Sequence, residues 1–65
     1  MKLITAHNVA VVVGFELEEK VIEEILNIEN IHTVVFLEDA FEGRDAMKAN
    51  AYFACKKMNI TMKTV

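Results

Sequence analysis

Proline is absent from this chain of 65 residues, glycine occurs twice and cysteine once. Disordered chains are rich in proline and glycine and poor in apolar residues, so this composition, which is 54% apolar, predicts a compact and regular domain. One cysteine excludes a disulfide within the chain and is typical of the reducing cytoplasm, where we expect the protein to be. Residues 1–65 form a single domain, near the lower size limit for a self-sufficient core.

Several patterns that would define a function class are also missing. No apolar run approaches a membrane span and no signal-peptide pattern occurs, so we expect no membrane partner. The formal net charge of −3 gives no support to nucleic-acid binding by this chain itself. Gly14 and Gly43 are isolated and fit no phosphate-binding loop, so no cofactor-binding residue is predicted. His7, His32 and Cys55 share no ligand spacing, which predicts no metal site.

The apolar residues alternate between two kinds of pattern. Val9–Val13 is a β-branched run and residues 34–37 are a continuous apolar run, as in strands buried on both faces. The predicted elements are strands over residues 2–5, 9–13, 31–37 and 60–65, and helices over residues 16–27 and 45–58. This β-β-α-β-α-β order predicts a small two- or three-layer α/β domain, with a mostly parallel sheet and an antiparallel N-terminal edge strand.

Apolar residues spaced three or four apart predict which side of each helix is buried. In the first helix these residues are Leu17, Val21, Ile22, Ile25, Leu26 and Ile28, with an acid-rich solvated face opposite. In the second helix they are Met47, Ala51, Ala54, Cys55 and Met58, with Asn50 on the same side. Cys55 is best explained as a small buried apolar residue, because no base adjoins it to make it a nucleophile.

The number of helices does not match the amount of apolar sheet. Two strands are apolar on both faces, but only two helices are available to cover them. If both crossovers run the same way, both helices cover one face and the other is bare; if the order reverses, neither face is fully covered. Either arrangement leaves apolar surface, which we expect a second copy or the rest of a larger protein to cover.

Glu38 and Asp39 follow a predicted parallel strand, at the end of the sheet where α/β proteins place their sites. There they could bind a metal or a phosphoryl ligand, and one functional hypothesis is therefore a free-standing small α/β domain with a ligand site at this pair. The alternative, which we favour, is that they solvate the strand end and orient the loop, because one acidic pair does not complete a site. No catalytic residue is predicted.

Five further residues are predicted to organise or extend the region after that strand. Asp45 is predicted to cap the second helix, and Asp45 and Asn50 together to fasten the loop over residues 41–43. Phe41 is expected to insert beside the helix. Tyr52 and Phe53 project away from the centre of the buried side, and either complete the rim of the core or form a docking surface.

The run AFEGRDAMKAN and the closing residues MKTV resemble the C-terminal end of type III restriction–modification methyltransferases, the Mod subunits. The family pattern there is similar to A-F-x-G-N-D-x-L-K-x-N, followed by a helix and a strand ending near R-T-V. The matching residues are Asp39, Ala40, Phe41, Gly43, Asp45, Lys48 and Asn50. Arg44, Met47 and Lys63 depart from it, standing where the family usually has Asn, Leu and Arg. The resemblance covers about half of the chain, residues 31–65.

The resemblance implies a C-terminal fragment of a DNA adenine-N6 methyltransferase. Such enzymes use S-adenosylmethionine through an F-x-G-x-G loop and act on a flipped adenine at a D-P-P-Y site. Neither motif occurs in this sequence, so the chain itself is expected to be non-catalytic and without cofactor. The implied role is structure and subunit assembly. The implied partners are the rest of the methyltransferase chain, a second copy in a homodimer and the restriction subunit, with DNA bound only through the parent protein.

Overall fold

The computed structural model describes residues 2–13 and 18–65 of the chain. Its elements are strands β1 (Lys2–Ala6), β2 (Val9–Val13), β3 (Thr33–Phe36) and β4 (Thr61–Thr64), helices α1 (Glu19–Leu26) and α2 (Asp45–Lys57), and the 3-10 helix η1 (Glu38–Phe41). Each predicted strand and helix is present, with ends that differ by up to three residues. Residues 14–17, which include the predicted helical positions Glu16 and Leu17, lie outside the described residues.

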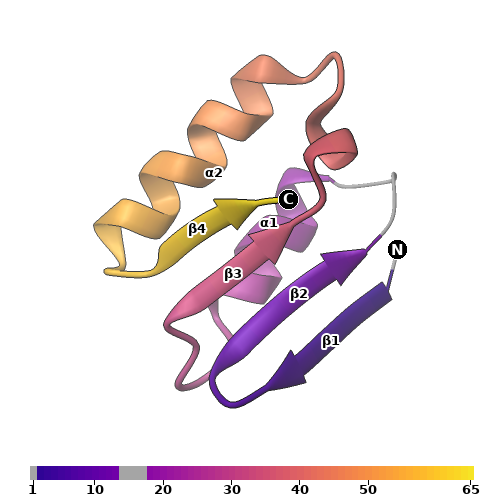
Figure 1. Cartoon of the computed structure of the whole chain (residues 1–65). Helices are drawn as coiled ribbons and strands as arrows, with labels where there is room; N and C mark the ends of the chain where they lie inside the picture. The colour runs from indigo at the N-terminus through magenta and orange to yellow at the C-terminus, as the bar shows by residue number, and fades with distance from the viewer. Residues whose placement is uncertain (1, 14–17) are drawn as a thin grey trace.

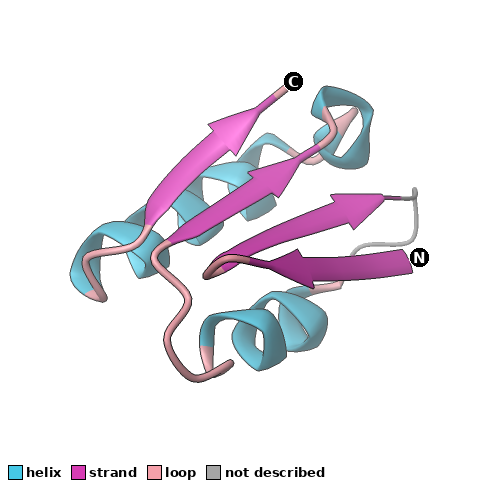
Figure 2. Cartoon of the chain, turned by 60° about the horizontal axis from the view of Figure 1, so that its bottom comes forward, coloured by secondary structure: helices cyan, strands magenta, loops and turns pink. Residues whose placement is uncertain are grey.

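The four strands form one sheet in the order β1-β2-β3-β4. β1 pairs antiparallel with β2, whereas β2, β3 and β4 are parallel to one another. The predicted fold class, a small α/β domain with a mostly parallel sheet, is therefore confirmed. Both crossovers step in the same direction, so right-handed connections place α1 and α2 on the same face. Figure 1 looks onto the uncovered face, with α1 behind the strands, and Figure 2 shows both helices below or behind the sheet.

The core lies between the sheet and the two helices. Alternate residues of β2 and β3 point towards the helices, because side chains of a strand alternate between its faces. These residues are Ala10, Val12, Val34 and Phe36, each fully buried. The other side of the core is formed by Ile22, Ile25 and Leu26 from α1 and by Ala51 and Cys55 from α2, and Ala40, Phe41 and Ile60 are also part of the core. The predicted inner side of α1 is thus confirmed for its described residues.

The connection from β3 to α2 is more regular than the predicted loop. Residues 38–41 form η1, whose Phe41 is buried and packs edge-on against Phe36, with ring centroids 5.0 Å apart. Phe41, which was expected to insert beside the second helix, is buried in the core against Phe36 of β3. Gly43 follows with φ +70°, a left-handed conformation that glycine adopts without a steric penalty. This turn reverses the chain into α2.

Candidate docking surface

The face of the sheet opposite the helices is apolar at its centre. The register places Ile4, Val11 and Val35 side by side across three strands on this face. Val9, Val13 and Ala6 extend the same surface, since they lie two residues along the same strands. The side chains of Ile4 and Val13 are 46% and 36% exposed. We call these six residues the uncovered face.

Two lysines flank the uncovered face. Lys2 lies on β1 and Lys63 on β4, both exposed and both pointing to the side opposite the helices by their register. Thr33 and Thr61 lie on the same face, in the row that includes Val9, next to the row of Val11, Val35 and Lys63. Among the described strand residues of this face there is no carboxylate. On the far side of the molecule, α1 presents exposed glutamates and α2 exposed lysines.

The predicted acidic pair lies where β3 ends, as expected for the carboxyl end of a parallel strand. Glu38 and Asp39 begin η1 and are exposed. They line a depression of about 330 Å³ together with Glu42, Asp45 and Lys48. Within residues 2–13 and 18–65, no group of three or more histidine, cysteine, aspartate or glutamate side chains is arranged to hold a metal ion. The geometry therefore adds no third ligand to the pair.

The predicted fastening of the loop by Asp45 and Asn50 is wrong. Asp45 is the first residue of α2 and the capping position falls on Arg44, so the carboxylate does not cap the helix. The loop is instead held by backbone bonds, in which the Arg44 amide donates to the Phe41 carbonyl at 2.8 Å and the Lys48 amide to the Arg44 carbonyl at 3.0 Å. Asn50 is exposed and its amide nitrogen lies 3.4 Å from a carboxylate oxygen of Glu19 on α1.

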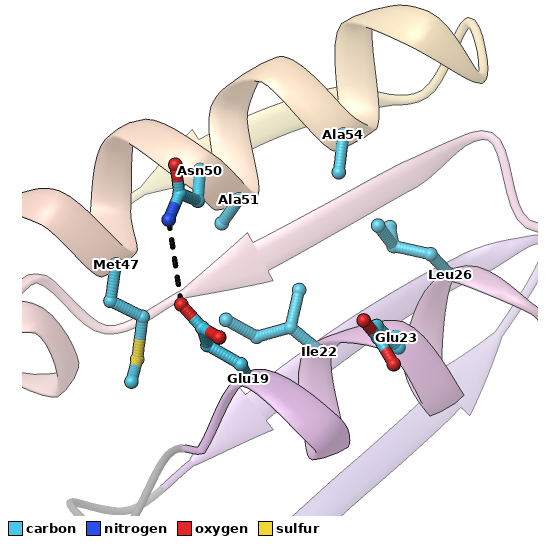
Figure 3. Close-up of a pocket in the computed structure, with 8 residues that line it drawn as sticks. All are labelled: Glu19, Ile22, Glu23, Leu26, Met47, Asn50, Ala51 and Ala54. Atoms are coloured by element: carbon cyan, nitrogen blue, oxygen red, sulfur yellow. Dashed lines mark hydrogen bonds between the residues drawn. The ribbon is translucent and has the colours of Figure 1, made fainter.

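Figure 3 shows that this bond bridges the mouth of a cleft between the two helices. The cleft has a volume of about 240 Å³ and an apolar floor that includes Ile22, Leu26 and Ala51. Glu19 and Asn50 stand at its rim. The prediction that Asn50 faces the core is wrong, because successive residues of an α-helix are rotated by about 100° around its axis. When Ala51 faces the sheet, Asn50 therefore faces α1.

The other side of α2 overhangs β4, the free edge of the sheet. A groove of about 390 Å³ runs between them, lined mainly by apolar atoms of Ala49, Tyr52, Phe53 and Met62. Tyr52 and Phe53 are 52% and 65% exposed and contact each other edge-on. The prediction that they point away from the core is confirmed, and a docking role for them stays a prediction. Met58, predicted to be buried, is exposed where α2 ends.

In the described part of the chain, no polar or charged side chain is buried. Cys55 is buried, and its desolvation raises the pKa of the thiol, as expected for a packed apolar residue rather than a nucleophile. No described helix has the length and apolar character that crossing a membrane requires.

The sequence indicated the uncovered face but not the groove beside β4. The apolar runs of β2 and β3 signal sheet faces that need cover, whereas the groove combines residues that are far apart in the sequence. Comparison of the chain with known protein families, with curated proteins and with solved structures finds no significant match.

Proposed function

We propose that this chain is a non-catalytic assembly module, the C-terminal part of a DNA adenine-N6 methyltransferase of a type III restriction–modification system. The observation that carries the assembly role is the uncovered face, a row of aliphatic side chains on a parallel sheet that has helices on one side only. Parallel sheets are almost always covered on both faces, and strands that are apolar throughout are suited to that cover. The identity of the parent enzyme rests on the resemblance of residues 31–65 to the Mod subunits.

In this proposal another protein layer covers Ile4, Val11 and Val35. The cover is supplied by the rest of the methyltransferase chain, a second copy of the module or the restriction subunit. S-adenosylmethionine and DNA bind elsewhere in the parent protein. The exposed acids Glu38 and Asp39 then solvate the end of β3, and a metal site there is not favoured because, among residues 2–13 and 18–65, no group of three metal-ligating side chains includes them.

Sedimentation of the isolated chain tests the assembly role. We expect reversible self-association, since an exposed aliphatic face of this kind associates when its natural cover is missing. Val35→Lys should shift the equilibrium towards monomer with an unchanged circular dichroism spectrum. Asn27→Lys is the matched control, because it introduces the same charge at an exposed position on the helix side and should leave association unchanged.

A strictly monomeric chain that also fails to bind a fluorescent dye for apolar surface would contradict the assembly role. The parent enzyme is tested separately by reading the coding DNA upstream of the Met1 codon. An open frame that encodes F-x-G-x-G and D-P-P-Y motifs supports a methyltransferase, and a stop codon directly upstream contradicts it.

A further inference from the structure

A second interaction surface lies at the edge of the sheet, separate from the uncovered face. We propose that β4 and the groove beside α2 bind an extended segment of a partner protein, which adds a fifth strand to the sheet. The segment carries apolar residues at alternate positions and carboxylates between them.

The backbone of β4 offers free pairing groups on its outer side. The Thr61 amide donates to the His32 carbonyl at 2.8 Å, and the Val65 amide donates to the Phe36 carbonyl at 3.0 Å. Residues along a parallel strand pair alternately with one neighbour and then the other. The amide and carbonyl groups of Met62 and Thr64 therefore point away from β3, towards the edge where the sheet order ends.

The same two residues also line the groove. Met62 and Thr64 are in register with the buried residues Val34 and Phe36, so their side chains lie on the helix side of the sheet. There they border the groove with Tyr52 of α2. Figure 1 shows β4 at the edge of the sheet with α2 beside it. A strand that pairs with Met62 and Thr64 places every second side chain in this groove, as in other complexes formed by strand addition.

Exposed aromatic side chains give the groove its apolar wall. Phe53 and Tyr52 are the most exposed aromatic residues of the described chain and both lie on the overhanging side of α2. Aliphatic side chains of an added strand would bury these rings, which are the residue types that dominate binding energy at interfaces. The groove therefore selects apolar residues at alternate positions of the segment.

The charge of Lys63 selects carboxylates at the other positions of the segment. Lys63 points to the opposite side of β4, beside the residues of an added strand that do not enter the groove. Lys48, with Asp45 beside it, lies on the rim of the groove, and Lys56 lines an adjoining depression that shares Tyr52 and Met62 with the groove. Both are on the helix side of the sheet, so Lys63, and not these two lysines, faces the carboxylates of the segment. A lysine on an edge strand discourages indiscriminate pairing, whereas an opposite charge on the facing strand stabilises it.

The same lysines argue against a second copy as the occupant. Symmetric antiparallel pairing about Lys63 brings the two Lys63 side chains face to face. Symmetric pairing about Met62 instead places the two-fold axis near Tyr52 of each α2, because Tyr52 and Met62 line the same two depressions. Lys48 and Lys56, each one turn from Tyr52, then meet across the axis. Like charges in facing positions destabilise both registers.

A titration with short, end-blocked peptides, followed by amide resonances of the labelled chain, tests this proposal. We expect a peptide of alternating valine and glutamate to shift signals of β4 and Phe53, and one of alternating valine and lysine to bind about fivefold more weakly. Lys63→Glu should reverse this preference. Lys2→Glu, the same change at the opposite edge of the sheet, should leave it unaltered.

Two further variants test the backbone and the groove. Thr64→Pro removes the outward amide but no bond to β3, and should weaken binding by about fivefold or more. Phe53→Ala should weaken it to a similar extent without altering the fold. Equal affinity for both peptides, shifts centred on β1, or unchanged affinity of Thr64→Pro would overturn the proposal, as would self-association abolished by Thr64→Pro. Val35→Lys should not alter peptide binding, so this proposal and the assembly role of the uncovered face fail independently.

Discussion

The two faces of the sheet are built from the same residue types and have opposite environments. Val34 and Val35 are neighbours in β3, yet Val34 is fully buried beneath the helices and Val35 lies on the uncovered face. The alternation of β2 is the same, with Val12 inside and Val11 outside. The difference comes from the topology: both crossovers step in one direction, so the helices lie on one side only. An apolar run indicates a strand suited to cover on both faces, while the connections decide which face the chain covers itself.

The largest expected effect comes from placing the same charge on each face in turn. Val34→Asp puts a carboxylate into a core without polar partners and should lower the free energy of unfolding by about 3 to 5 kcal/mol. A core of this size supplies about that much in total, so the variant should be unfolded. Val35→Asp, one residue away, should lower it by less than about 1 kcal/mol. Urea unfolding followed by circular dichroism measures both, and equal losses would mean that the two faces are buried alike.

The sequence contained enough to predict the elements and their order. β2 has the predicted bounds. Its β-branched residues favour a strand, and the turn residues that precede Val9 mark where that strand begins. Bare sheet surface was also predicted, since two helices cannot cover two apolar faces. Which of the two arrangements occurs could not be predicted, because strand order depends on long-range pairing rather than on local pattern.

The details of α2 were less predictable than those of α1. α1 has one apolar side and one acidic side, so its buried residues follow from spacing alone. α2 has apolar residues on three sides: Met47 and Ala54 towards α1, Ala51 towards the sheet, and Phe53 towards the groove beside β4. When a helix has apolar residues on several sides, their spacing does not show which side is buried. For this reason Asn50 was predicted to lie on the buried side.

The turn that leads from β3 to the helix layer gives the next largest expected effect. Gly43 has φ +70°, and no atom lies within 4 Å of the position that a Cβ would occupy. Gly43→Ala therefore introduces backbone strain without a steric clash, and should lower the free energy of unfolding by about 1 kcal/mol. A chemical denaturation curve measures the loss. Glu42→Ala, at the exposed preceding residue, is the control and should change stability less; an equal loss in both variants would show that the left-handed conformation is not responsible.

The pH dependence of stability reports on the covered face through Cys55. Burial raises the pKa of its thiol, so the folded chain holds the proton more tightly than the unfolded chain. The stability that the protonated, buried thiol contributes is fully present below the unfolded-state pKa, about 8.5. It is lost as the pH rises from there through the folded-state pKa. Stability should therefore fall more steeply with alkaline pH in the natural chain than in Cys55→Ala. Parallel pH profiles of the urea midpoint in the two proteins would show that the thiol is not protected by the core.

The smallest expected effect concerns Asn50, at the rim of the cleft between the helices. Its only described side-chain bond is a long one, 3.4 Å to the exposed carboxylate of Glu19, and exposed polar pairs of this kind contribute little. Asn50→Leu should change the free energy of unfolding by less than about 0.5 kcal/mol, and Glu19→Gln should do the same. A double-mutant cycle with both changes isolates the bond from the effects of each substitution. A coupling energy well above this range would show that the cleft contributes to holding the two helices together over the covered face. In that case the helix layer, and not the sheet alone, would determine which face remains available for a partner.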